Sequence, residues 1–512
     1  MKTSFYKKFN LNYIKKNYKS TPFLILIIAF IIIIIINFFY KKTTQKKLYI
    51  GCLYSETGIM GEFEKPNYDI LIKSLKYVVD RENVNIKIIP LYMDLKSNDN
   101  NYIKWIEHCV KNYNVKYFFG CWKSSTRKAV LDTLKKYNVC LFYPLQYEGV
   151  ECNQNVYYFG STPNQQIVPA IDYYFSKYEK IKDVYIIGSD YVYPRVVADI
   201  IQNYMEKWND RFNKNLKYIS FHPLDENNFS DIINKIFNDS PNGAIIINNI
   251  NGDSLYKFFE QFYTIYYKNN DTTFDKKFRE DPLKFINYFN SWNDKRSEKN
   301  NSNEKLYENF DPFSMNVLNN KNDKKFDLNF KIYNKYPIIS FSLPENNINK
   351  KFSKYLYATS SCWSFMSDVI INPMLYVVNI ENKKVINDIK FLKSINNQII
   401  GDTQYSTFLS VLFFVTALKK IMNNNEDIND VNIYHKNRLV NIISVTGEHS
   451  FLKNNHINKP FYCGYFDENN KFFTEYDSLK FVDPDPFYDI AVSSKYNVYC
   501  EDKDIFIRNS SK

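Results

Sequence analysis

Residues 118–149 constrain the fold of this chain more than any other stretch. An apolar strand at residues 115–120 ends at a glycine, an amphipathic helix follows, and a second apolar strand at residues 139–143 ends at Pro144. The pattern predicts a strand–helix–strand unit with a polar loop after each strand, which is where open α/β sheets bind ligands. No His or Lys stands in these loops where it would activate a serine, so they indicate a binding crevice and not a catalytic site.

The same alternation of strands and helices extends over most of the chain. It begins near residue 47, starts again after residue 160, and dissolves at residues 268–331, which we interpret as a low-complexity insertion. Repeated alternation predicts a doubly wound parallel sheet, here in two lobes. The expected strands are 47–54, 85–92, 115–120, 139–143, 183–188, 217–221, 244–248, 336–342 and 356–361, and the expected helices are 70–79, 102–110, 164–178, 195–208, 231–237 with Ser230 as its cap, 255–266 and 403–422.

An unbroken apolar run at residues 22–40 predicts one transmembrane helix, because about 20 residues span a bilayer core. Six lysines in residues 1–21 precede it, so we expect a basic cytoplasmic tail, a signal anchor and an extracytoplasmic binding domain. No small-residue cleavage site follows the run. A cleaved signal peptide stays as the alternative.

The charge of the chain lies mostly in that first segment. The net charge is +12 over 512 residues, and residues 1–47 hold ten lysines and no acid, so the rest carries 12 − 10 = +2. A nearly neutral main domain gives no reason to expect a nucleic-acid partner. None of the eight cysteines has CxxC spacing, so we predict no metal and no cofactor and leave disulfide connectivity open.

With these residues placed, the chain resembles the type I periplasmic binding proteins, and more narrowly their amide- and urea-binding branch. The similarity rests on short motifs that occur in order along residues 47–490, outside the insertion. They are residues 54–58 (YSETG), 119–122 (FGCW), 125–130 (STRKAV), 143–144 (YP), 147–149 (YEG), 163–166 (PNQQ), 188–195 (GSDYVYPR) and 251–254 (NGDS), with weaker matches at 340–342, 454–456 and 482–486.

This resemblance implies two α/β lobes joined by three crossovers, over residues 47–500, with a cleft that closes on its ligand. The first lobe takes residues 47–162 and 364–445, and the second takes 163–363 and 446–500. It also implies capture of urea or a short-chain amide, for an ABC transporter or for sensing. The ligand-binding residues that we predict are Trp122, Ser124, Tyr143, Leu145, Gln146, Tyr191, Asp253, Ser342 and Trp363.

The chemistry of these side chains suits a small, neutral, planar ligand. Hydroxyl groups such as those of Ser124, Tyr143 and Tyr191 both donate and accept hydrogen bonds, and an aromatic wall such as Trp122 excludes water. An amino acid would need an anion site and a carboxylate for its ammonium group, which Asp253 could supply, so amino acids stay an alternative ligand. The sequence departs from the amide-sensing members at Leu145, where they carry a small polar residue.

Each candidate also has a purely structural interpretation. Ser124 stands at a helix start, where serine commonly caps, and Trp122 and Trp363 could fill the core between the lobes. Three further hypotheses about function stay open: a receptor or regulatory subunit that acts on a partner, a family member that no longer binds, and a type II membrane enzyme such as a glycosyltransferase. The enzyme is disfavoured because the chain has no GxSxG motif, no P-loop and no convincing carboxylate pair.

Overall fold

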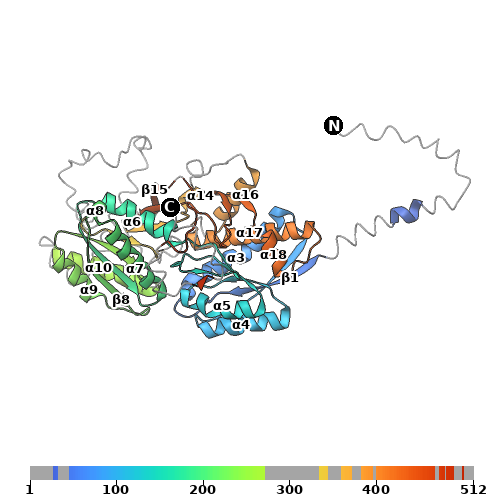
Figure 1. Cartoon of the computed structure of the whole chain (residues 1–512), viewed down its shortest axis with the longest axis horizontal. Helices are drawn as coiled ribbons and strands as arrows, with labels where there is room; N and C mark the ends of the chain where they lie inside the picture. The colour runs from blue at the N-terminus through green and yellow to red at the C-terminus, as the bar shows by residue number, and fades with distance from the viewer. Residues whose placement is uncertain are drawn as a thin grey trace, which may run out of the picture.

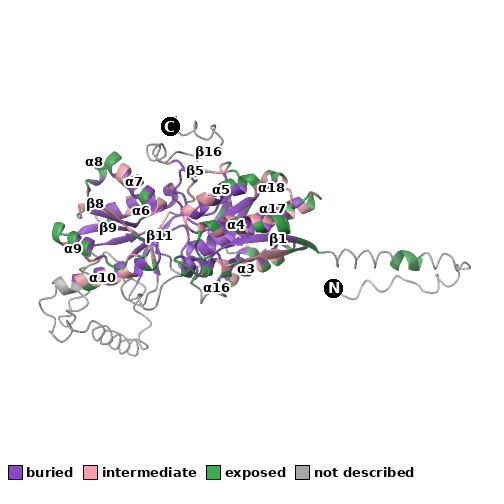
Figure 2. Cartoon of the chain, turned by 90° about the horizontal axis from the view of Figure 1, so that it is seen from below, coloured by how far each residue is buried: buried purple, intermediate pink, exposed green. Residues whose placement is uncertain are grey.

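The computed structural model describes residues 27–32, 45–270, 334–343, 359–371, 382–395, 399–466, 472–478, 480–488 and 499–500. These residues form two α/β lobes that lie side by side, with the chain passing between them more than once (Figure 1). Buried residues concentrate in the two sheets and exposed residues on the outer faces of the helices (Figure 2).

The first lobe is built on a five-stranded sheet in the order β2-β1-β3-β4-β6, in which every pair is parallel. Helix α3 packs with α17, and α4 packs with α5 on the opposite face of the sheet (Figure 1). A hairpin, β12 with β13, follows α18. The elements are β1 (Lys46–Leu53), α3 (Gly61–Glu82), β2 (Ile86–Leu91), α4 (Asp99–Tyr113), β3 (Tyr117–Gly120), α5 (Ser124–Tyr137), β4 (Cys140–Tyr143), β6 (Val156–Tyr158), α14 (Asp368–Ile371), α16 (Lys383–Lys393), α17 (Asp402–Asn423), α18 (Val431–Asn437), β12 (Asn441–Ser444) and β13 (Gly447–Ser450), while β5 (Glu151–Cys152) pairs with β16 (Tyr499–Cys500).

The second lobe is built on a seven-stranded sheet in the order β15-β14-β11-β10-β9-β7-β8. The five strands from β11 to β8 are parallel, and β14 and β15 extend that sheet in antiparallel fashion. Helix α6 packs with α7, and α9 packs with α10. The elements are α6 (Pro163–Lys177), β7 (Asp183–Ser189), α7 (Val192–Lys207), α8 (Asn209–Phe212), β8 (Asn215–His222), α9 (Ser230–Asp239), β9 (Ala244–Asn249), α10 (Asp253–Asn270), β10 (Ile338–Ser340), β11 (Ser360–Trp363), β14 (Tyr462–Phe466) and β15 (Phe472–Asp477).

Two parallel sheets in an α/β arrangement confirm the predicted fold class. Most observed strands and helices follow the predicted ones to within a few residues, because the buried faces carry an uninterrupted apolar pattern. Helix α3 is the exception, since it begins at Gly61, well before the predicted start at residue 70. Ser230, the predicted cap of α9, is instead the first helical residue after Phe229, which makes no side-chain capping bond. The predicted lobe boundary at 445/446 falls in the turn of the β12–β13 hairpin.

Within the described residues, α17 is the one helix long and apolar enough to cross a membrane, and 78% of its most apolar window is buried. It packs against α3 and is the core helix of the first lobe. Of the predicted anchor at residues 22–40, only residues 27–32 are described, and they are helical. The basic tail at 1–21 and nearly all of the predicted insertion at 268–331 lie outside the described residues.

Three crossovers connect the lobes, at residues 159–162, 364–367 and 451–461. The ammonium group of Lys459, in the third, donates to the carbonyl of Phe159 in the first at 2.8 Å and to the Ser406 hydroxyl at 2.8 Å. It also lies 3.4 Å from the Asp402 carboxylate, and both side chains are fully buried. The Ser161 and Ser364 hydroxyls join the first crossover to the second. The buried ammonium group of Lys459 therefore joins the third crossover to the first and to α17, and the serine pair joins the first crossover to the second.

Lys459→Met should lower the free energy of unfolding by about 3–5 kcal/mol, because it leaves the Asp402 carboxylate buried without its cation. Adding Asp402→Asn should recover a large part of the loss. Guanidinium chloride unfolding of the full-length chain in mild detergent measures both; urea is avoided because it is a candidate ligand. Lys453→Met, at an exposed position in the same crossover, is the matched control, and an equal loss from both lysines would contradict the hinge role.

Candidate functional site

A small cavity lies between the lobes, with about 20 Å³ of space for the centres of water-sized molecules. The first lobe contributes the loops after β3 and β4 and the start of α17, and the second contributes the loops after β7, β9 and β10 and the end of β11. Ten residues line it: Trp122, Ser124, Leu145, Gln146, Tyr191, Tyr193, Asn251, Ser342, Trp363 and Thr403.

The loop after β3 brings Trp122 and Ser124 to the cavity. Gly120 has a φ of +124°, and a Cβ there would lie 2.3 Å from the carbonyl oxygen of Leu53, so the turn admits only glycine. Cys121 also has a positive φ, 64°, and its N–H donates to Leu53 at 2.8 Å. The chain thereby turns sharply out of the sheet, and Trp122 packs against Phe63 of α3 with ring centroids 6.0 Å apart.

Behind this wall lies a fully buried ionic network centred on Arg127. Its guanidinium contacts Glu148 at 3.0 Å and Glu151 at 3.0 Å, and the three side chains are at most 3% exposed. The Ser124 hydroxyl donates to the Glu148 carboxylate at 2.5 Å. Although burial opposes ionisation, the charges of Arg127 and Lys128 hold the pKa of Glu148 below its usual value. The network fixes the loop that carries Leu145 and Gln146 against α5.

Tyr143 belongs to this network and not to the cavity wall. Its hydroxyl donates to the backbone carbonyl of Trp122 at 3.2 Å and accepts from Arg127 at 3.3 Å, with its side chain fully buried. As the last residue of β4, Tyr143 points under the loop after β3, whereas Leu145 and Gln146, which follow Pro144, line the cavity. The predicted role of Tyr143 as a direct ligand contact is therefore not supported; it braces Trp122 from behind.

The second lobe places Tyr191, Tyr193, Ser342 and Trp363 opposite this wall. Tyr191 is the N-cap residue of α7, and Trp363 is the last residue of β11. The Trp363 indole N–H donates to the carbonyl of Leu343 at 3.0 Å, so the ring offers the cavity an apolar surface. The lobes touch across the cleft, since Gln146 donates to the Phe341 carbonyl at 3.4 Å.

Asp253 does not reach the cavity. It is exposed at the first turn of α10. The pKa of Glu62 on the first lobe is raised, first by the partial burial of Glu62 itself and second by the negative charge of Asp253. The predicted carboxylate for an ammonium group is therefore absent from the wall, and all ten lining residues are uncharged. The loop after β9 presents Asn251 to the cavity, and Asp253, two residues later, already belongs to α10.

Four buried polar atoms of the lining residues make no close hydrogen bond among the described residues, although the Gln146 and Tyr193 side chains lie near enough to interact with each other. Each is a hydroxyl or amide oxygen, and three of them donate as well as accept. An unpaired buried polar group costs about 1–3 kcal/mol, so such a set indicates a place where a polar ligand or water supplies the missing bonds. The atoms are Gln146 Oε1, Tyr193 OH, Ser342 Oγ and Thr403 Oγ1.

Three lining residues were missed in the sequence. Tyr193 and Asn251 both lie inside motifs that pointed to the site. The predicted Tyr191 lines the cavity beside Tyr193, whereas Asp253 was predicted in place of Asn251. Thr403 follows the buried Asp402 at the start of α17, more than 250 residues after the first-lobe loops at 121–124 and 144–149. Nothing local marks it, because only the return of the chain to the first lobe brings it to the cleft.

The loop after β1, on the rim of the cleft, is fixed by the buried Glu64 of α3. This carboxyl accepts from the backbone N–H of Ser55 at 2.8 Å and from the Tyr102 hydroxyl at 2.7 Å. Burial raises its pKa to about 8, against the opposing effect of those hydrogen bonds. In the folded protein, the Glu64 carboxyl is therefore mainly protonated and neutral at neutral pH.

Comparison with known proteins agrees with this geometry. Residues 48–273 match the family model described as a periplasmic binding protein domain. A solute binding protein of an ABC transporter from R. palustris in complex with 4-hydroxybenzoate has 12% identity and a TM-score of 0.60, covering 86% of this chain and 99% of that one. An amino acid ABC transporter substrate-binding protein from Pseudomonas fluorescens has 12% identity and a TM-score of 0.59 over 86% and 98%.

A substrate binding protein of a branched-chain amino acid transporter from Streptococcus pneumoniae, in complex with isoleucine, has 11% identity and a TM-score of 0.56 over 86% of this chain and 100% of that one. At such identities these likenesses show the fold alone. Residues 48–273 are therefore similar to a periplasmic binding protein domain, and the chain shares the fold of these solved structures. The comparisons do not single out the amide- and urea-binding branch.

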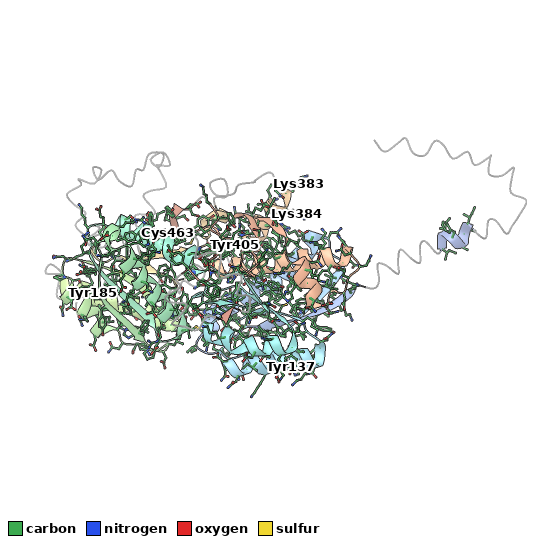
Figure 3. The ribbon with its side chains drawn as sticks, in the orientation of Figure 1. Tyr137, Tyr185, Lys383, Lys384, Tyr405 and Cys463 are labelled. Atoms are coloured by element: carbon green, nitrogen blue, oxygen red, sulfur yellow. The ribbon has the colours of Figure 1, made fainter. Side chains whose placement is uncertain are left out.

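Tyr143→Phe should lower the free energy of unfolding by about 1–2 kcal/mol, because it leaves the Trp122 carbonyl and an Arg127 N–H without their partner. Guanidinium chloride unfolding measures it. Tyr137→Phe, at the half-exposed end of α5 (Figure 3), is the matched control and should change stability by less than about 0.5 kcal/mol. A stability equal to that of the control would contradict the bracing role.

Glu64 should make the protein less stable as pH rises from about 4.5 to 8. Its folded pKa exceeds its unfolded one, so the folded state holds the extra proton, and the stability present below pH 4.5 is lost as pH rises through 8. The difference between the stability–pH curves of wild type and Glu64→Gln should span about a few kcal/mol. Glu206→Gln, exposed on α7, should show no such difference; parallel curves for Glu64→Gln and wild type would refute the assignment.

Proposed function

We propose that this chain is a membrane-anchored solute-binding protein that captures urea, a short-chain amide or a similar small neutral solute between its lobes. The observation that carries this proposal is the uncharged cavity, to which both lobes contribute polar atoms that make no close hydrogen bond among the described residues. Urea and short amides supply N–H donors and a carbonyl acceptor on a planar frame, which matches a wall of hydroxyls, two amides and two indoles. Binding drives hinge closure, and no chemical step is involved.

Size and charge favour such a ligand over those of the similar structures. The space open to the centres of water-sized molecules is only about 20 Å³, which favours a small solute. The ligands named for two of those structures, 4-hydroxybenzoate and isoleucine, are larger and carry a carboxylate. Burying a carboxylate without a charged partner is costly, and none of the ten lining residues is charged.

The membrane anchor at residues 22–40 is part of the same proposal. In its described piece, the apolar side chains of residues 27, 28, 30, 31 and 32 are 39–65% exposed, as expected of a helix that lipid surrounds. The binding domain would then be extracytoplasmic, and the partner would be an ABC transporter in the same membrane. A receptor or regulatory subunit would use the same cleft, and solute uptake in a strain lacking the chain separates these two roles.

Titration calorimetry of the full-length chain in detergent tests the ligand class, with urea, formamide, acetamide, leucine and 4-hydroxybenzoate as probes. Urea or a short amide should bind most tightly. Thr403→Val keeps the shape of the side chain and removes its hydroxyl, so it should weaken that ligand about fivefold or more, the equivalent of one buried hydrogen bond of about 1 kcal/mol.

Thr416→Val, the same change at a half-buried position farther along α17, is the matched control and should leave affinity unchanged. Tighter binding of leucine or 4-hydroxybenzoate than of every amide would replace the proposed ligand class. If no probe binds to the folded chain, the capture of these solutes is wrong.

A further inference from the structure

The hydroxyl of Ser124 is the point at which the buried ionic network meets the cavity. Ser124 lines the cavity and is 3% exposed. Its Oγ lies 2.5 Å from Glu148 Oε2 and 3.4 Å from Arg127 Nη1. A hydroxyl has one proton and two acceptor positions. Arg127 and Glu148 therefore occupy the proton and one lone pair, and leave a single acceptor position.

Glu148 accepts that proton because the network keeps it ionised. Its carboxylate is fully buried and lies 3.0 Å from Arg127 and 3.6 Å from Lys128, which supply the compensating charge. An ionised carboxylate has no proton to give. The Ser124 hydroxyl consequently cannot turn its proton toward the cavity without abandoning a short, charge-assisted hydrogen bond.

The neighbouring Gln146 has a similar restriction. Its amide nitrogen donates across the cleft to the carbonyl of Phe341 at 3.4 Å, and its Oε1 is buried and makes no close hydrogen bond among the described residues. The amide oxygen is an acceptor only. The loops after β3 and β4 thus present two acceptors, Ser124 Oγ and Gln146 Oε1, next to the apolar side chain of Leu145, while the Thr403 hydroxyl of α17 adds a group to the same wall that can also donate.

We propose that Glu148 is the specificity-determining residue of this site: it commits Ser124 to the role of acceptor, so that the cavity selects ligands with N–H donors on the face toward the first lobe. This inference rests on the proposed function and adds to it the reason for choosing amides. A ligand of the same shape without N–H groups leaves both acceptors unpaired, which is the kind of mismatch that polar sites reject most strongly. Glu148 acts through Ser124 and is a positioning residue.

Urea, acetamide and acetone test this inference, because the three molecules are nearly identical in shape and carry two, one and no NH₂ groups. In the wild-type chain, affinity should fall at least about tenfold from urea to acetone. Glu148→Gln replaces the carboxylate by an amide that can donate to Ser124, which frees the serine proton for the cavity. The ratio between urea and acetone should then shrink to about threefold or less, measured by calorimetry with displacement for the weak ligand.

Glu151→Gln is the matched control, since it makes the same charge change at the other carboxylate of Arg127, for which the structure gives no bond to Ser124. It should lower stability as Glu148→Gln does and keep the wild-type ratio. Ser124→Ala, a smaller change, should reduce the ratio as well, and adding Glu148→Gln to it should alter the ratio no further.

The results separate the inference from the function on which it rests. If Glu148→Gln and Glu151→Gln give the same ratio, or if Ser124→Ala keeps the full discrimination, the role of Glu148 is refuted while urea binding stands. If the folded wild-type chain binds none of the three solutes, the proposed function fails and the inference fails with it. Should Glu148→Gln not fold, the Ser124→Ala ratio alone decides.

Discussion

A guanidinium group with no exposed surface stays charged only if carboxylates and hydrogen-bond acceptors surround it, and Arg127 meets this condition with Glu148 and Glu151. Both acids lie in one segment, so neutralising Arg127 forces that segment to fold back over the start of α5. The Tyr143 and Tyr147 rings close over the guanidinium at 5.0 and 4.7 Å. The position of the first-lobe wall of the cavity is therefore a consequence of one buried charge.

The hinge uses a second buried charge for a different purpose. Lys459 satisfies a carbonyl of the first crossover and a hydroxyl and a carboxylate of α17. Next to it, Tyr405 of α17, near the middle of the molecule in Figure 3, stacks on Phe365 of the second crossover at 4.0 Å. Helix α17 therefore contacts all three crossovers, through Lys459, Phe365 and Phe159.

Most of the fold could be predicted because each strand and helix has a local signature. Strand β9 begins with the continuous apolar run 244–247, and the long helix at the start of which Thr403 stands carries the largely apolar run 408–415. The cap of α9 could not be predicted in this way. Ser230 has the right chemistry, but a helix can begin one residue earlier when Phe229 gains more from burial than a hydroxyl gains from capping.

The site was harder to predict, because a side chain reaches a cavity only through the exact direction of its backbone. Seven of the nine predicted residues line the cavity, and all of these follow the end of a strand or close one. Tyr143 fails because it is still within β4, where alternation turns it under the sheet edge toward Arg127. Asp253 fails because it is already the first residue of α10, where exposure at a helix N-terminus suits an acid.

The side chain of Leu145 limits the space on the first-lobe side of the cavity. Leu145 is 6% exposed, and its backbone carbonyl lies so close to Gly160 that a Cβ there would be 1.7 Å away, so the loop cannot retreat from the cavity. A small polar residue here would add one more group able to bond the ligand. Leucine instead narrows the space, so the polar groups of the first-lobe wall are those of Ser124, Gln146 and Thr403. A Ser124 proton held by Glu148 would then favour a ligand that brings an N–H group to the serine oxygen.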